Sequence, residues 1–414
     1  MVQERLYLKG DRLLDISDYE FKSIKNSLKL GRENTIQKIK NSELKGRGGA
    51  GFPTGVKWEM AADIDAEEKF VVCNGDEGEP GTFKDRYLLE ERALKVLEGI
   101  MIAAFAVGAA KAYIYIRGEY SKAIEVFSEI IENAKKEKIL DNYLFNSEYK
   151  LELKLVRGAG AYVCGDETSL LNSIEGKRGR SRIKPPYPIE KGLFNKPTVV
   201  NNVESLCCAA EVMNPDSEEF SSLGSEGSRG TKLLCLSGDI NKPGLYEVEF
   251  DKITLEEIIY ELAGGIKDNE KLRFVVPGGI STAVIKAEDL NFPYSYQAFE
   301  KKGSSLGSGA VIAVSKKHDL LDLMLNVSRF YMDETCGTCF PCREGNRQIN
   351  RMLKLFKEEN KKVDAELISD IGNTIRLAAR CGLGQSSLNF ITSVIENYSE
   401  ELKIGGKIYA KSRN

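Results

Sequence analysis

The sequence predicts an α/β protein that continues into a small domain of short strands and ends in a bundle of helices. Before residue 220, a strand pattern is followed twice by a polar loop and then by a helical pattern, which is the order expected of an α/β domain. Short strand signals then alternate with turns, and helical spacing of apolar residues dominates from Asp319 onward. The predicted domains are therefore residues 1–220, 230–315 and 319–404.

The first predicted domain opens with charged helices over residues 12–45, which end at a glycine-rich run, residues 46–55. So many glycines in succession must form a loop. The apolar residues 70–73 predict a buried strand, and the turn-rich segment 74–81 follows it. A long helix is predicted to begin at about Asp85.

The most apolar stretch, residues 99–116, is interrupted by Lys111 and predicts a buried helix running into a strand over 112–116, with no membrane span. The second occurrence of the strand, loop and helix order starts with a predicted strand at 151–156. Residues 214–230 are rich in Ser, Gly and Glu, a composition typical of a linker. In the third domain, helices are predicted over residues 320–331, 344–357 and 365–380.

Charge and cysteine usage exclude several classes of protein. The 59 Lys and Arg residues nearly balance the 62 Asp and Glu residues, and both signs are scattered, which argues against a nucleic-acid binder. The N-terminal segment is charged and has no apolar stretch of signal-peptide length, so a reducing cytoplasmic location is expected. The nine cysteines include one tight group only and predict no disulfide framework.

That group consists of Cys336, Cys339 and Cys342, with Cys381 as a remote fourth member just before Gly382. Two residues between successive thiolates let a loop wrap one corner of a 4Fe-4S cluster, which is the favoured interpretation. Zinc is the main alternative, but common zinc sites use two separated Cys-x-x-Cys pairs. Four inert buried cysteines are the remaining alternative, and bound iron with acid-labile sulfide would distinguish the three.

The glycine-rich run matches neither the phosphate loop of ATPases nor the dinucleotide-binding glycine motif. Residues without Cβ nevertheless allow backbone amides to approach a phosphate or a ring, and Arg47 and Lys57 add positive charge. A plain tight turn is the alternative.

Asn74, Asp76, Glu77 and Glu79 follow the predicted strand, at the place where open α/β sheets bind ligands. They would suit ribose hydroxyls or the polar edge of a flavin. An acidic turn that caps the next helix is the alternative.

Six motifs follow one another along the chain, and Cys336 lies in the last of them: GRGGAGFPTGVKW at 46–58, CNGDEGEPGTFKD at 73–85, GAGAYVCGDET at 158–168, KPPYP at 184–188, KPTVVNNVE at 196–204 and DETCGTCFPCR at 333–343. They resemble the NADH-binding FMN and 4Fe-4S flavoprotein subunit of complex I and its homologues in NAD-dependent hydrogenases, formate dehydrogenases and electron-bifurcating enzymes. The resemblance covers nearly the whole chain. The sequence departs from the family at Asp166, where Glu is common, and at Met60, where an aromatic residue is often found, and both differences bear on nucleotide affinity or on the preference between NADH and NADPH.

The resemblance implies a Rossmann-like FMN- and NADH-binding domain, a ubiquitin-like β-grasp domain of the soluble-ligand-binding type, and a helical bundle that holds the cluster. It implies that FMN is held by Gly46, Arg47, Gly48, Gly49, Ala50, Lys57, Asn74, Asp76, Glu77, Gly165, Asn201 and Asn202. NADH would contact Phe52, Lys57, Glu79, Glu167 and Phe194, with the two aromatic rings stacking. Because the chemistry belongs to the flavin, no catalytic residue is expected, and Glu79 and Lys57 are the nearest candidates.

The implied function is oxidation of NADH, with hydride transfer to FMN and single-electron transfer through the cluster to partner subunits. The chain begins shortly before Gly46 and ends soon after the Cys381 helix, so a thioredoxin-like 2Fe-2S domain and further clusters are expected on separate subunits of a complex I, hydrogenase, formate dehydrogenase or bifurcating assembly. A non-catalytic iron-sulfur scaffold is the alternative function.

Overall fold

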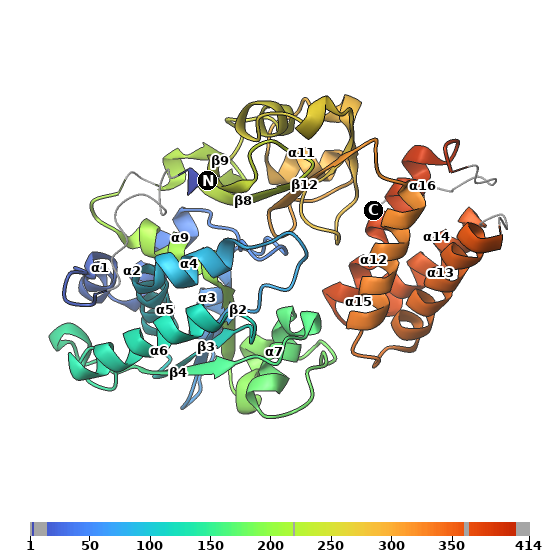
Figure 1. Ribbon diagram of the computed structural model, residues 1–414. Coiled ribbons are helices and arrows are strands. Elements are labelled where there is room, and N and C mark those ends of the chain that lie inside the picture. Colours follow the sequence, from blue (N-terminus) through green and yellow to red (C-terminus); the bar gives the residue numbers. More distant parts are fainter. Residues whose placement is uncertain (1, 4–14, 218–219, 360–363, 403–414) are drawn as a thin grey trace.

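The computed structural model describes residues 2–3, 15–217, 220–359 and 364–402, and places three groups of elements side by side (Figure 1). The first group is built on a four-stranded parallel sheet in the order β4 (Glu152–Arg157), β3 (Lys111–Ile116), β2 (Phe70–Gly75), β5 (Thr198–Asn202). Both predicted strand-loop-helix units are present in it, and the α/β prediction is confirmed.

Nine α-helices accompany this sheet in the described residues: α1 (Lys22–Leu30), α2 (Arg32–Asn41), α3 (Thr54–Ala62), α4 (Lys84–Glu91), α5 (Ala93–Val107), α6 (Ser121–Lys136), α7 (Glu167–Ile174), α8 (Pro188–Lys191) and α9 (Val203–Met213). The prediction of one long helix from about Asp85 is wrong. The backbone of Arg92 is non-helical, with φ −132° and ψ 30°, and it separates α4 from α5. The break lets almost every residue of α5 be buried.

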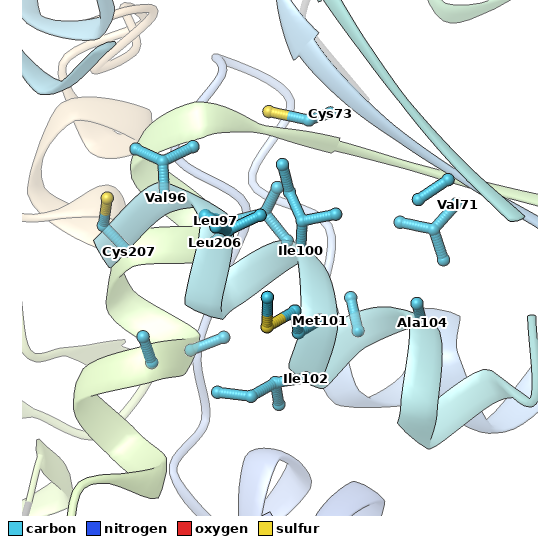
Figure 2. Packing of buried hydrophobic residues seen from close by; sticks show 14 of the residues in the cluster. Val71, Cys73, Val96, Leu97, Ile100, Met101, Ile102, Ala104, Leu206 and Cys207 are labelled. Atoms are coloured by element: carbon cyan, nitrogen blue, oxygen red, sulfur yellow. The ribbon is translucent and has the colours of Figure 1, made fainter. Parts of the chain in front are cut away.

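Helix α5 packs against both the sheet and α9, and α9 also contacts β2 and β5. Figure 2 shows its side chains pointing both toward Val71 and Cys73 of β2 and toward Leu206 and Cys207 of α9. Gly99 lies at this crossing, where a Cβ atom would collide with the backbone carbonyl of Leu206. Close approach of two helix backbones therefore depends on a residue without a side chain.

Replacing Gly99 with Ala is expected to lower the free energy of unfolding by about 1 to 3 kcal/mol, because overpacking outweighs the better helix propensity of alanine. Chemical denaturation followed by circular dichroism measures this. Gly382→Ala is the matched control, since a Cβ there meets nothing within 4 Å. If the two variants were equally stable, the close approach of α5 and α9 at Gly99 would be contradicted.

The second group is a mixed sheet in the order β1 (Val2–Gln3), β9 (Gly244–Glu249), β8 (Thr231–Gly238), β12 (Ala310–Ser315), β10 (Leu272–Val276), β11 (Ile285–Lys286). The first hairpin strand, β8, pairs in parallel with the last strand, β12, as in a β-grasp sheet. The helices α10 (Leu255–Glu257) and α11 (Tyr296–Lys301) and the π-helix Ile258–Leu262 accompany it. In the described residues, the predicted linker contains a small hairpin, β6 (Gly224–Ser225) and β7 (Ser228–Arg229).

The third group is helical, as predicted, and stands apart at one end of the molecule (Figure 1). Its helices are α12 (Leu320–Glu334), α13 (Phe340–Glu359), α14 (Ala365–Ala378), α15 (Gly382–Ser386) and α16 (Asn389–Tyr398). Within the described part of the chain, no helix is long and apolar enough to cross a membrane.

Candidate functional site

The glycine-rich run forms a loop that closes on itself. The Gly46 amide donates to the Phe52 carbonyl over 2.9 Å, and residues 48–50 at the tip are exposed. Gly49, with φ 123°, adopts a backbone conformation that other residues avoid. A Cβ on Gly48 would lie 3.0 Å from the Cβ of Asn202. The loop tip, which includes Ala50, therefore lies against the carboxyl end of β5 and leaves its backbone open to a ligand.

The acidic loop follows β2 at the same edge of the sheet. Asn74 donates from Nδ2 to the carbonyl of Gly165 over 3.0 Å, and its Oδ1 accepts the Asp76 amide over 3.0 Å. Asp76 is 9% exposed, yet its Oδ2 has no hydrogen-bond partner. Burial raises the pKa of Asp76 to about 7. Because a buried carboxylate oxygen without a donor is costly, this oxygen fits a group that brings its own hydroxyl donors, such as the ribityl chain of a flavin.

The Arg47 side chain is turned away from the exposed tip of the loop. It is 1% exposed, and its guanidinium donates to the carbonyls of Lys45 over 3.1 Å and Arg229 over 2.7 Å. The guanidinium carbon also lies 4.9 Å from the centre of the Phe250 ring. The charge that the sequence suggested for a ligand is used to join the loop to the β-grasp domain, and the Arg47 amide donates to the Ser205 hydroxyl over 2.8 Å.

Glu77 also has its polar atoms occupied within the protein. Its carboxylate accepts the Asp85 amide over 2.9 Å, and the Arg86 amide and the Tyr120 hydroxyl each over 3.0 Å. These contacts fix the first turn of α4, where a carboxylate satisfies amides that lack helical partners. The helix-capping alternative for the acidic loop therefore describes Glu77, while Asp76 keeps an unused oxygen.

The two asparagines at the end of β5 support the loops. Asn201 accepts the Trp58 indole N–H over 2.9 Å, and Asn202 accepts the Glu204 amide over 3.0 Å as the N-cap of α9. Asn202 also donates to Asp85 over 2.6 Å. Asn201 therefore holds α3, which follows the glycine-rich loop, and Asn202 holds α4.

Both rings predicted to stack are exposed: Phe52 lies in the glycine-rich loop, and Phe194 lies beside Phe70 at the start of β2, with ring centres 5.9 Å apart. Phe52 is 46% exposed and Phe194 is 49% exposed, so about half of each side chain is open to a ligand. The Lys57 ammonium lies 5.8 Å from the Phe52 ring centre and donates to the Val200 carbonyl over 3.2 Å. Burial lowers the pKa of Lys57, and nearby Glu167 opposes this. A planar, anionic ligand could stack and pair here.

Sequence reasoning assigned no role to Lys184, although it lies in one of the motifs. Its ammonium is 2.8 Å from the Glu167 carboxylate, at the start of α7. Lys184 also contributes to the lowered pKa of Lys57, so the three charges share one site. The signal that could have indicated Lys184 was its place before two prolines and the exposed Tyr187.

Glu79 lies where the three groups of elements meet. Its Oε1 accepts the Ser281 amide over 2.9 Å, and its Oε2 accepts the Tyr162 hydroxyl. The Tyr162 amide donates to Glu334 over 3.0 Å, and Glu334 is the last residue of α12. Burial raises the pKa of Glu79, and the bonds from Tyr162 and Ser281 lower it. Sequence reasoning missed Tyr162, which lies in the short 3-10 helix Tyr162–Gly165.

The four cysteines lie at the end of the helical domain that faces the domain with the parallel sheet. Cys342 and Cys381 are buried in one apolar cluster, and Cys336 and Cys339 pack against it. A Cβ on Gly384 would lie 3.2 Å from Cys342 Sγ, so the turn after Cys381 runs beside that thiol. Burial raises the pKa of Cys381 to about 11. Within the described residues, no three Cys, His, Asp or Glu side chains are grouped to hold a single metal ion.

This donor set fits an iron-sulfur cluster chemically. Four cysteines supply the four thiolates that a 4Fe-4S cluster requires. The left-handed backbone of Gly337, with φ 76°, turns the chain between Cys336 and Cys339.

Comparisons with known proteins agree with these sites. The family described as Nuo51 FMN-binding domain matches residues 39–211, an SLBB domain matches 232–312, and the NADH-ubiquinone oxidoreductase-F iron-sulfur binding region matches 322–404. The F subunit of NADH-quinone oxidoreductase from Aquifex aeolicus is 40% identical over 93% of this chain and 89% of its own length.

Hydrogenase components are similar as well. The NADP-reducing hydrogenase subunit HndC of Solidesulfovibrio fructosivorans is 38% identical over 88% of this chain and 74% of its own length. A crystal structure of an air-oxidized NAD+-reducing NiFe-hydrogenase matches all of this chain and 70% of its own chain, with a TM-score of 0.86 and 31% identity. The chain therefore belongs to the family of FMN- and 4Fe-4S-binding flavoproteins that includes the F subunit of NADH-quinone oxidoreductase.

Proposed function

We propose that this chain oxidises NADH at FMN and passes the electrons singly, through a 4Fe-4S cluster, to partner subunits. One observation carries the proposal. The short helix Tyr162–Gly165 contacts Asn74 through Gly165 at one end, and Glu334 through Tyr162 at the other. Glu334 is two residues before Cys336, so the loop proposed for the flavin and the cysteines are joined through a single turn.

We assign the roles of the binding residues from the polar atoms and ring surfaces that remain exposed or without a partner in the structure. The amides of residues 48–50 are exposed for a phosphate or ring face, and Asp76 Oδ2 is free to accept from hydroxyls. We assign Phe52 and Phe194 to stacking, and Lys57 with Lys184 to the negative charge of the dinucleotide. When bound, FMN would supply the change from a two-electron donor to single-electron steps, and a cluster held by the cysteines would accept the single electrons. The binding residues would hold FMN, and the cysteines would hold the cluster, at the positions that electron transfer requires.

The family and the names of the relatives support a place in a multi-subunit oxidoreductase, because the similar proteins are named as subunits. We propose a thioredoxin-like 2Fe-2S subunit and a further iron-sulfur or catalytic subunit as partners. All nine cysteines are free of disulfide bonds, which supports a reducing, cytoplasmic location.

The test uses the full chain loaded with FMN, iron and sulfide. NADH should bleach the flavin absorption and then produce the electron paramagnetic resonance signal of a reduced cluster. In Cys339→Ser the bleaching should persist while the cluster signal is lost. Cys207→Ser, at a buried position of α9 in the core around α5, is the control and should retain both. Loaded protein whose flavin NADH does not bleach would favour the non-catalytic scaffold.

A further inference from the structure

Two arginines bind the backbone of the cysteine loop from opposite sides of a domain boundary. Arg178 donates from Nη2 to the Cys336 carbonyl over 3.0 Å, and Arg343 donates from Nη1 to the Gly337 carbonyl over 2.6 Å. Arg343 follows Cys342 on α13, whereas Arg178 belongs to the segment after α7, in the domain with the parallel sheet. The flavin-binding domain therefore places a guanidinium on the loop that carries the cysteines.

The segment that carries Arg178 is held firmly on both sides. Gly179 passes so closely over Cys164 that a Cβ would lie 2.6 Å from its Sγ. The Arg180 carbonyl accepts the Asn172 amide group over 2.7 Å, and Arg182 pairs with Glu175 over 2.9 Å. An exposed arginine is usually mobile, but here the adjoining backbone is fixed by α7.

The charges of the two arginines are not equivalent. Arg343 pairs with Glu344 over 2.8 Å, which offsets its positive charge. Among the described residues, Arg178 forms no ion pair, and its bond to the Cys336 carbonyl leaves its full charge beside the loop. A carbonyl carries no net charge, so Arg178 contributes an uncompensated positive charge next to the cysteines.

We propose that the positive charge of Arg178 raises the reduction potential of the 4Fe-4S cluster. The inference rests on the proposed function only in requiring the cluster. A cluster that gains one electron gains one negative charge, and a fixed positive charge nearby stabilises the reduced form. Because Arg178 comes from the flavin-binding domain, the potential depends on contact between that domain and the helical domain. Separating the two domains would therefore remove this stabilisation of the reduced cluster.

The experiment compares Arg178→Gln with wild type in a redox titration of the full, loaded chain followed by electron paramagnetic resonance. Iron and sulfide contents are measured first. At a fixed ambient potential, the ratio of reduced to oxidised cluster should fall roughly three- to tenfold in R178Q, and tenfold equals about 59 mV for a one-electron couple. Arg180→Gln is the matched control, since the side chain of Arg180 is exposed and lies two residues away, and it should leave the ratio unchanged.

Arg178→Lys separates charge from hydrogen-bond geometry, and it also serves if R178Q does not retain the cluster. Its ammonium keeps the charge, so the wild-type ratio is expected. A full cluster with an unchanged ratio in R178Q, or a ratio lowered tenfold in R178K, would overturn the proposal. Fully loaded protein whose flavin does not respond to NADH would instead contradict the proposed function and leave the titration valid.

Discussion

Replacing Glu204 with Gln is expected to lower the free energy of unfolding by about 3 to 5 kcal/mol. Glu204 is fully buried, and its Oε2 lies 2.5 Å from the Lys232 ammonium and 3.1 Å from the Lys84 ammonium. Its Oε1 accepts the Leu233 amide over 2.9 Å. The neutral side chain would leave an excess of buried positive charge where α9 and α4 of the flavin-binding domain meet β8 of the β-grasp domain. Chemical denaturation measures the loss.

The same carboxylate makes a defined contribution to acid stability. Burial alone would raise the pKa of Glu204, but Lys232, Lys84 and Arg47 together lower it from 4.5 to about 2. A depressed pKa in the folded state stabilises the protein above pH 4.5, and this stabilisation is lost as the pH falls toward 2. The difference between wild type and E204Q should therefore shrink over that interval.

Glu68→Gln is the matched control for E204Q. Glu68 pairs with Lys111 over 2.8 Å at the surface, with side-chain exposures of 36% and 43%. An exposed pair of this kind contributes about 1 kcal/mol or less. If E204Q lost no more stability than E68Q, the buried charges would not join the two domains as described.

The elements that could be predicted from the sequence are those specified by local pattern. The apolar strand starting at Phe70, the loop that begins at Gly46 and the helices after Asp319 all follow from spacing within a few residues. The prediction of a cluster at the cysteines rests on the same kind of local spacing, and the match to an iron-sulfur binding region over residues 322–404 supports a cluster in this part of the chain. The break at Arg92 was missed because no Gly or Pro marks it between Lys84 and Glu98.

Residue roles were harder to predict because they depend on contacts distant in sequence. Arg47 looked like a ligand residue by its position in the loop, yet its guanidinium contacts Arg229 and Phe250. Glu77 and Asp76 are adjacent acidic residues in different environments, one fully bound at a helix start and the other with a free oxygen. No local pattern distinguishes them, because the tertiary fold decides which carboxylate meets backbone amides.

The unpartnered Oδ2 of Asp76 makes the substitution of this residue the second with a large expected effect. Asp76→Asn should weaken FMN binding about 10- to 100-fold, because a hydrogen bond to a charged group contributes roughly 1.5 to 3 kcal/mol. The same substitution should stabilise the flavin-free protein at pH 8 by about 1 to 3 kcal/mol, since it removes a buried and incompletely paired carboxylate. Quenching of FMN fluorescence measures binding, and chemical denaturation of the flavin-free protein measures stability.

The pH dependence distinguishes this effect from a general change in folding. The folded protein holds the Asp76 proton up to a pKa of about 7, whereas the unfolded chain releases it near 3.8. The folded state binds more protons between these values, so the wild type loses stability as the pH rises from 3.8 to about 7. The advantage of D76N should be complete above that interval and absent below it. Asp65→Asn, at an exposed position, should change neither FMN affinity nor stability. If D76N bound FMN as tightly as the wild type, Asp76 would not be part of the flavin site, and its unpartnered oxygen would be a cost to stability alone.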